Sequence, residues 1–229
     1  MSSIAQVSVA LAALLVLDVA AQATATSTQS ILLPTVRPST AFIVPPDFLG
    51  VGFESAYLPA YNNDFSENLV NSLGSRIAAP STIRIGGPSG DKLTFDPNQK
   101  ASTWCPTGDC VGYSNKAFVL GPSYFDTFKR FQSARFTFQA SLGHNPNATN
   151  VIANVKHAYA AVGPSRLDAI AVGNEVNWYE DSAATYVADA QTAKDAITSV
   201  LDLKDPIWEI PDSAVGAGNP YAVKEVFDK

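Results

Sequence analysis

The feature that most constrains the fold is a regular alternation of apolar, strand-like runs with segments of helical periodicity. Five apolar runs lie at about residues 48–54, 82–87, 135–142, 167–173 and 206–210. Runs that are apolar throughout, rather than at every second residue, are typical of parallel strands buried on both faces. The order strand, helix, strand, helix therefore predicts parallel βα units.

The helical segments carry their own start and stop signals. Apolar residues repeat at helical spacing from Val151 to Val162 and stop at Gly163, a usual C-terminal signal. Asp181 or Ser182 can cap a longer helix that runs to about Val200.

Three further segments complete the helical pattern, and one segment departs from it. A stripe of Phe65, Leu69 and Leu73 predicts a helix that ends at Gly74, and four aromatic residues within 124–131 mark another. A last helix is expected to begin near Tyr221. Between the second strand and about residue 121 the chain carries a polar insertion that contains the cysteines.

Two architectures compete for this pattern. A doubly wound sheet usually has a glycine-rich phosphate loop after its first strand, but the run 50–54 (GVGFE) ends in a carboxylate and lacks the third glycine. In the fourth strand the small residues Ala169, Ala171 and Gly173 share one parity, which suits a crowded barrel interior. The fold class predicted is α/β, of the (β/α)8 TIM-barrel type.

The spacing of the strands predicts how much of a barrel this sequence holds. Successive units are about 39 residues apart, so eight units need about 312 residues, and five fit in the 229. We therefore expect residues 1–23 to be a signal peptide, residues 24–47 an N-terminal extension and residues 48–229 an incomplete (β/α)8 barrel.

The N-terminus resembles a secretory signal. Val7–Leu17 is an apolar run of about 11 residues, where a membrane span needs about 20, and Ala21-Gln22-Ala23 supplies an A-x-A cleavage pattern. A short buried helix is the alternative. The expectation is a secreted, extracellular chain that is not membrane-bound after cleavage.

Charge and composition restrict the partners. The net charge is −6 and no basic run occurs, which argues against nucleic acid as a partner. A hydrophobic fraction of 46% with 16% charged residues favours a globular chain with a large core.

The two cysteines lie in a short turn-forming segment. Cys105 and Cys110 can close a small disulfide loop outside the cell. A zinc site is the alternative, but neither His144 nor His157 lies near the cysteines in sequence, so we expect no metal and no cofactor. Asn147 begins an Asn-Ala-Thr glycosylation sequon.

Carboxylates recur at the expected C-terminal ends of strands, where barrels place catalytic groups. Glu54 ends the first strand, Asp91 follows the second, and Asn174 and Glu175 follow the fourth. Each can equally be a helix cap or a loop charge, and Asp212, after the fifth strand, is interpreted in that way. Glu175 is harder to dismiss: on interior parity it must lie in a cleft or be paired, and such a carboxyl can protonate a leaving-group oxygen, as in glycosidases.

Arg84 and three aromatic residues fit the same interpretation. By alternation in its strand Arg84 points into the barrel, where a permanently charged guanidinium needs carboxylate partners; a purely structural ion pair is equally open. Tyr57, Trp178 and Tyr179 lie beside strand ends and can stack on sugar rings, although loop aromatics as often only pack.

Three segments together resemble glycoside hydrolase family 79, the β-glucuronidase and heparanase-like family, in its secreted fungal form: Ile83–Asp91, Phe138–Gly143 and Ala171–Tyr179. The likeness runs from about Phe48 to the last residue, and the Gly-Asn-Glu segment after a fourth strand is its most specific part.

The resemblance implies a retaining mechanism on a (β/α)8 barrel that acts on uronosyl linkages of polysaccharide or proteoglycan glycans. It makes Glu175 the general acid/base and Asn174 a sugar-binding residue, and it places Glu54 and Asp91 in the pocket of the terminal uronic acid. The nucleophile of the family, a glutamate at the end of the seventh strand, is absent from the five units, so this chain is expected to be inactive by itself.

Two other hypotheses remain open at this stage. The chain can be a secreted, non-catalytic carbohydrate-binding pseudoenzyme that keeps Asn174, Glu54 and the aromatic residues. It can also lack a stable folded product, since five parallel strands of an unclosed barrel leave two apolar edges.

Overall fold

The computed structural model describes Val36, residues 38–106, 117–143, 148–203 and 206–214, Tyr221 and Val226. Contacts between Cα atoms divide the chain into Met1–Ile43 and Val44–Lys229, and the second unit contains all the elements described below. The predicted signal peptide lies outside the described residues. Within the described part of the chain, no helix combines the length and the apolar character that a membrane crossing requires.

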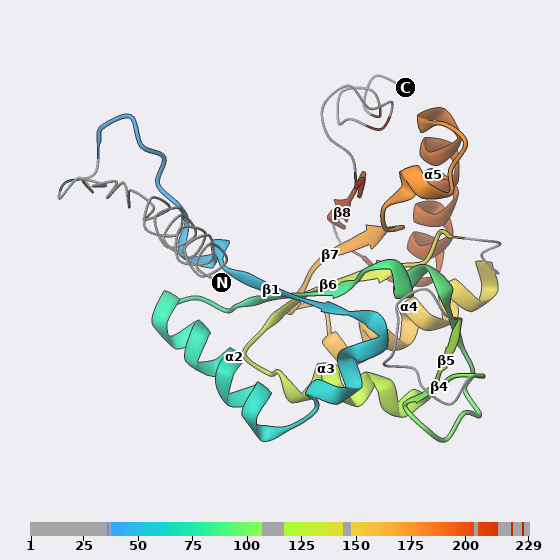
Figure 1. Cartoon of the computed structure of the whole chain (residues 1–229), viewed down its shortest axis with the longest axis horizontal. Helices are drawn as coiled ribbons and strands as arrows, with labels where there is room; N and C mark the ends of the chain where they lie inside the picture. The colour runs from blue at the N-terminus through green and yellow to red at the C-terminus, as the bar shows by residue number, and fades with distance from the viewer. Residues whose placement is uncertain are drawn as a thin grey trace, which may run out of the picture. The chain divides into compact units, whose positions relative to one another are not determined.

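A five-stranded sheet forms the centre of the second unit (Figure 1), and neighbouring strands are parallel throughout. Its strand order follows the chain: β1 (Gly50–Glu54), β2 (Thr82–Gly86), β6 (Arg135–Ala140), β7 (Leu167–Val172) and β8 (Trp208–Glu209). The predicted parallel βα architecture is therefore confirmed. The first strand begins at Gly50 rather than near Phe48, because a 3-10 turn, η1 (Pro46–Phe48), precedes it.

Helices connect successive strands, as the alternation predicts. They are α2 (Asp64–Ile77), α3 (Asp126–Arg130), α4 (Ala148–Val162) and α5 (Ala183–Val200), with 3-10 segments η2 (Ser55–Tyr61), η3 (Pro88–Lys92), η4 (Pro122–Phe125) and η5 (Val176–Trp178). The stop after α4 is confirmed at Gly163, whose φ is +76°. Ser182 caps α5 by accepting a hydrogen bond from the backbone N of Thr185. The helix expected near Tyr221 falls mostly outside the described residues.

The core lies between the sheet and its covering helices. Four consecutive residues of β7, Ala169–Val172, are each at most 8% exposed. Burial of both faces explains why this run reads as continuously apolar rather than alternating, whereas the edge strands β1 and β8 contain no buried residue. Between β6 and the η4–α3 segment the aromatic rings of Phe125, Phe128 and Phe136 pack against one another.

The insertion expected to be polar forms a small sheet of its own. Strands β3 (Leu93–Phe95), β4 (Thr103–Trp104) and β5 (Phe118–Leu120) pair in the order β3-β5-β4. Asn150 at the start of α4 ties this sheet to the main unit, because its side chain both accepts from the Phe95 N (2.8 Å) and donates to the Phe95 O (2.7 Å). These strands are two or three residues long, too short for their sequence pattern to predict them, and contacts with distant parts of the chain stabilise them.

The helix predicted from the stripe of Phe65, Leu69 and Leu73 is present, but the first two of these side chains do not pack against the core and the predicted end is wrong. Phe65 and Leu69 are 75% and 61% exposed, whereas Ser66 and Val70, one position further round the helix, are buried. The helix also continues through Gly74 and ends at Ala78, which adopts the left-handed conformation. Periodicity identifies an apolar stripe, but which stripe packs is decided by the surface that the neighbouring elements present.

Candidate active site

The C-terminal ends of the parallel strands meet at one edge of the sheet, and most of the polar residues singled out from the sequence lie there. Glu54 ends β1, Asp91 lies in η3 after β2, and Asn174 and Glu175 follow β7. This is the edge at which α/β barrels carry their chemistry.

The carboxylate of Glu54 lies against the turn that follows β2. Its Oε1 accepts a hydrogen bond from the backbone N of Ser89 (2.7 Å). Gly87 makes this approach possible: its φ is +93°, and a Cβ at that position would lie 2.1 Å from Oε2 of Glu54. The Ser89 hydroxyl in turn accepts from the backbone N of Ala56 (2.9 Å). The turn therefore fixes the end of β1 to the end of β2.

Asp91 is buried in the next part of the same turn. Its Oδ1 accepts from Nε2 of Gln139 (2.8 Å) and from the backbone N of Leu142 (3.2 Å) and of Gly143 (3.3 Å). Its Oδ2 accepts from the backbone N of Asn174 (3.1 Å). Burial raises the pKa of Asp91 to about 6, and these four hydrogen bonds limit the rise by stabilising the ionised form.

Asn174 and Glu175 leave β7 in an irregular backbone. The strand ends at Val172, Gly173 has φ +77°, and Glu175 itself has φ +48°. Strand parity therefore does not extend to Glu175 as the alternation argument assumed, and its direction is set by this turn. A non-glycine residue in the left-handed region costs about 1 kcal/mol or more, and such residues occur at helix ends, as Ala78 does, and cluster at functional sites.

The side chain of Asn174 is 6% exposed, and its Nδ2 has no hydrogen-bond partner among the described residues. Its backbone N–H donates both to Oδ2 of Asp91 and to the hydroxyl oxygen of Tyr179, which lies 3.3 Å from the Asn174 N. Glu175 is half-buried beside it. A buried amide donor without a partner marks a position where a ligand oxygen can bind.

Arg84 finds carboxylate partners, as its inward position in β2 predicts. Its Nε donates to Oε1 of Glu209 (2.8 Å) and its Nη2 to Oδ2 of Asp212 (2.5 Å). Burial alone would lower the pKa of Arg84, but the hydrogen bonds and charges of the two carboxylates outweigh it and raise that pKa. The interpretation of Asp212 as a cap or loop charge is wrong. Asp212 lies 128 positions after Arg84 in the sequence, and the fold places its carboxylate against the Arg84 guanidinium.

Gln139 was not recognised as a site residue from the sequence, although it lies within one of the motifs. Its amide is 4% exposed and packs against Gly90 so closely that a Cβ there would lie 2.3 Å from Oε1. A Cβ on Gly86 would meet both this oxygen (3.0 Å) and Nη1 of Arg84 (2.8 Å). A glutamine between Phe138 and Ala140, near the C-terminal end of its strand, was the available signal.

The three aromatic residues near the strand ends differ in their surroundings. Trp178, three positions after Glu175, is 70% exposed. Tyr57 packs partly against the core, and the Tyr179 hydroxyl lies under the Asn174 backbone. Of these three residues, Trp178 is therefore the one whose ring is exposed enough to stack on a sugar.

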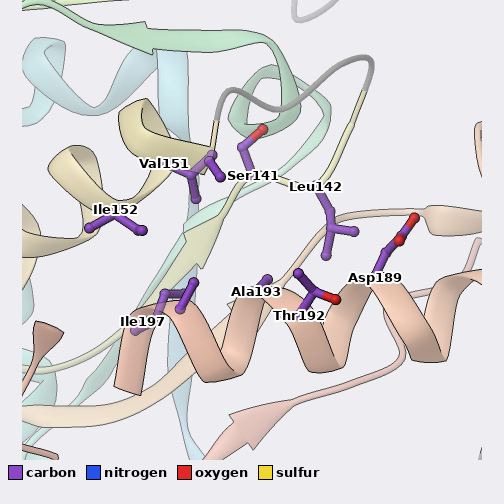
Figure 2. Close-up of a pocket in the computed structure, with 10 residues that line it drawn as sticks. Ser141, Leu142, Val151, Ile152, Asp189, Thr192, Ala193 and Ile197 are labelled. Carbon is purple, nitrogen blue, oxygen red and sulfur yellow. The ribbon is translucent and has the colours of Figure 1, made fainter. Parts of the chain in front are cut away.

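An apolar cavity of about 250 Å³ lies away from the carboxylates, between α4 and α5 (Figure 2). Side chains from the end of β6 and from both helices converge on it, among them Leu142, Val151 and Ala193. It contains none of the candidate site residues, although the backbone N of Leu142 also donates to Asp91.

The remaining predicted sites lie partly outside the described residues. Cys105 is buried and disulfide-bonded, and Cys110 lies outside the described part, so their pairing with each other stays a prediction. Asn147 and His144 also lie outside it. In the ranges that the structure describes, no three His, Cys, Asp or Glu side chains are grouped to hold a metal ion.

Comparison with known proteins shows that the chain is similar to glucuronidases. No family model matches the chain. It is 31% identical over 128 residues to a β-glucuronidase of Neurospora crassa and 25% identical over 158 residues to a β-glucuronidase of Aspergillus niger. These alignments cover 53% and 66% of this chain but only 22% and 28% of the relatives, so the chain spans less than a third of their length.

A solved structure agrees in fold. A 4-O-α-L-rhamnosyl-β-D-glucuronidase from Fusarium oxysporum 12S, in complex with Rha-GlcA, matches with a TM-score of 0.61 at 24% identity, over 69% of this chain and 36% of that one. The (β/α)8-type fold class is therefore confirmed, with a sheet of five parallel strands that does not close within the described residues. The chain is thus similar in sequence to part of two fungal β-glucuronidases and in fold to part of a glucuronidase structure, as its motifs indicated.

Proposed function

We propose that this chain carries the sugar-binding and acid/base part of a secreted, retaining glycoside hydrolase that cleaves β-glucuronosyl linkages in glycans. The observation that carries the proposal is the buried Nδ2 of Asn174 at the C-terminal edge of the sheet, for which the described residues offer no hydrogen-bond partner. Leaving such a donor unpaired costs about 1–3 kcal/mol, which a sugar hydroxyl would recover on binding. The names of the relatives and of the solved structure support a glucuronosyl sugar.

In this proposal Glu175 is the general acid/base. Beside Asn174, it would protonate the glycosidic oxygen and then activate the water that releases the sugar. Its half-buried position leaves it open to a substrate. Glu54, held by Ser89, would accept hydrogen bonds from sugar hydroxyls, since an ionised carboxylate is an acceptor only.

The nucleophile is proposed to come from outside the five described strands. A retaining enzyme needs a second carboxyl about 5–5.5 Å from the acid/base, and the family resemblance assigns it to a seventh strand. The carboxylates of Glu209 and Asp212 are engaged by Arg84. The 229 residues by themselves are therefore expected to bind a glucuronide without hydrolysing it.

Binding tests the proposal directly. Titration with D-glucuronate, followed by NMR or calorimetry, should show saturable binding that Asn174→Ala weakens at least tenfold. The matched control is Asn98→Ala, which removes an exposed asparagine and should leave the affinity unchanged. A folded wild-type chain that shows no binding of D-glucuronate would refute the proposed sugar site.

Turnover tests the assignment of the nucleophile. An aryl β-glucuronide should not be hydrolysed by the 229-residue chain. Turnover that Glu175→Gln abolishes would mean that a nucleophile is already present among these residues. Binding without hydrolysis in a longer form of the chain would instead favour a non-catalytic glycan-binding protein.

Secretion is tested separately. Expression of the whole sequence in a secreting host should release a chain whose N-terminus follows Ala23. Retention inside the cell with an intact N-terminus would contradict it.

A further inference from the structure

The carboxylate of Asp91 is the point at which three chain segments are joined. It accepts a hydrogen bond from the side chain of Gln139 in β6, two from the backbone after β6 at Leu142 and Gly143, and one from the backbone of Asn174 after β7. Asp91 itself belongs to the segment after β2. One side chain therefore connects the C-terminal ends of three neighbouring strands.

The packing around Asp91 leaves little room for any other arrangement. A Cβ on Gly143 would lie 2.6 Å from the Cβ of Asp91, and one on Gly90 would lie 2.3 Å from Oε1 of Gln139. Asp91 is 7% exposed. Its oxygens are thus occupied by protein donors in a closely packed cage, and little of its surface is left for a substrate.

We infer that Asp91 is a positioning residue: its ionised carboxylate fixes the backbone of Asn174 and thereby the direction of the Asn174 amide and of Glu175. The inference rests on the proposed function, since the groups it positions are the proposed sugar-binding and acid/base residues. The contact with the uronic acid predicted for Asp91 from the family resemblance stays a prediction.

Only a carboxylate can satisfy all of these donors. Three N–H groups converge on Oδ1 and one on Oδ2, and an ionised carboxylate offers about four lone-pair sites and no hydrogen of its own. Protonation, or replacement by an amide, puts a donor opposite one of the N–H groups. The four hydrogen bonds are therefore expected to be stronger when Asp91 is ionised, although burial as a whole favours its protonated form.

The electrostatic surroundings of Asp91 support a pH-dependent junction. Burial raises its pKa to about 6. The groups that face it from the η5–α5 region are Tyr179, Glu180 and Tyr186, whose own pKa values burial raises first and the charge of Asp91 raises further. No cation is among these charge partners, so the three backbone amides and the Gln139 amide carry the stabilisation of the ionised form.

The first experiment needs neither a variant nor a ligand. The backbone amide resonances of Leu142, Gly143 and Asn174 in the wild-type chain should titrate together with a midpoint near pH 6, because their protons point at one carboxylate. Gln139→Met removes one donor and leaves the three backbone donors, so it should move this midpoint upward. Amides that do not titrate together, or a midpoint that Gln139→Met leaves unchanged, would overturn the inference.

The second experiment separates positioning from general stability. At pH 7.5, Asp91→Asn should raise the Kd for D-glucuronate at least tenfold and shift the Asn174 amide resonance. The matched control is Asp168→Asn, because Asp168 joins β2, β6 and β7 at their opposite ends, through Thr82 and Arg135. It should lower the Tm and leave the Kd within twofold.

The outcomes distinguish this inference from the proposed function. If the wild-type chain does not bind D-glucuronate, the proposed function fails, while the amide titration still decides whether the junction exists. If Asp91→Asn binds D-glucuronate normally, with an unchanged Asn174 resonance, the positioning role is excluded. If Asp91→Asn does not fold, Gln139→Met takes its place in the binding measurement, and unaltered binding together with an unmoved midpoint excludes the role.

Discussion

The two ends of the central sheet each hold an aspartate that joins β2, β6 and β7, yet the two junctions are built differently. At the C-terminal end Asp91 is 7% exposed and accepts three of its four hydrogen bonds from backbone amides. At the N-terminal end Asp168 accepts from the Thr82 hydroxyl (2.8 Å) and forms an ion pair with Arg135.

The difference follows from what each end must do. Side-chain partners such as Thr82 and Arg135 can adjust to small movements, so the Asp168 junction can stabilise the sheet without determining where any loop lies. Backbone donors cannot move without moving the loop, so the Asp91 junction fixes the chain that carries Asn174. In (β/α)8 barrels generally, the N-terminal ends of the strands contribute to stability and the C-terminal ends carry the functional residues.

The largest expected effect concerns the pH dependence of stability. The pKa of Asp91 is raised from 3.8 to about 6, so the folded chain binds more protons than the unfolded chain between these values. The contribution of Asp91 to stability is therefore fully present below about pH 4 and is lost as pH rises through 6. A shift of this size corresponds to about 3 kcal/mol.

Urea unfolding of the wild type and of Asp91→Asn at pH 4 to 7.5 measures this effect. The free energy of unfolding of the wild type, minus that of the variant, should fall by about 2.5 kcal/mol across the range, because part of the effect is already lost at pH 4. A difference that stays constant, or that rises with pH, would show that Asp91 is not the buried carboxyl described here.

The second prediction disturbs the C-terminal junction through its backbone. Gly143→Ala should destabilise the chain by about 1–3 kcal/mol and weaken D-glucuronate binding, because its Cβ would collide with that of Asp91. Gly52→Ala in β1 is the control, since a Cβ there meets nothing within 4 Å. Equal effects of the two substitutions on unfolding in urea would count against a tight cage around Asp91.

The third prediction concerns the ion pairs beside that junction. Arg84→Met should cost about 2 kcal/mol, because it leaves the carboxylates of Glu209 and Asp212 without their cation. Lys129→Met, which breaks an exposed pair with Asp126, should cost less than about 0.5 kcal/mol by the same unfolding measurement. If both variants have the stability of the wild type, the Arg84 pairs are no more than surface contacts.

The smallest effect is expected at the N-terminal junction. Asp168→Asn keeps an acceptor for Thr82 but loses the charge opposite Arg135, so we expect a loss of about 1 kcal/mol. Calorimetric unfolding measures it. A drop in D-glucuronate binding as large as that of Asp91→Asn would remove the distinction between the two ends.

Much of the fold was predictable because it depends on local patterns. Continuous apolar runs predicted parallel strands buried on both faces, and the order of the strands in the sheet is the order along the chain. Caps and stops such as Ser182 and Gly163 were also correct, since their signals are confined to a few residues. The packing face of α2 was not predictable, because it depends on distant elements.

The candidate site divides in the same way. Glu54, Asp91 and Asn174 could be selected because parallel strands bring their C-terminal ends to one edge. The partners of Arg84 and the place of Gln139 could not, since they result from contacts across many tens of residues. The direction of the Glu175 side chain could not be predicted from strand alternation, because the positive φ values at Gly173 and Glu175 interrupt the extended backbone.

By itself, the sequence determined the parallel βα architecture, the edge of the sheet that holds the polar residues and the likeness to glucuronidases. Only the tertiary structure decided that Asp91 lies buried among backbone donors, that Asp212 pairs with Arg84 and that Nδ2 of Asn174 has no hydrogen-bond partner in the described part of the chain. The reason is physical: strand and helix patterns arise from neighbouring residues, whereas burial, pairing and the pKa of a carboxyl depend on whatever the folded chain brings within a few ångströms of it.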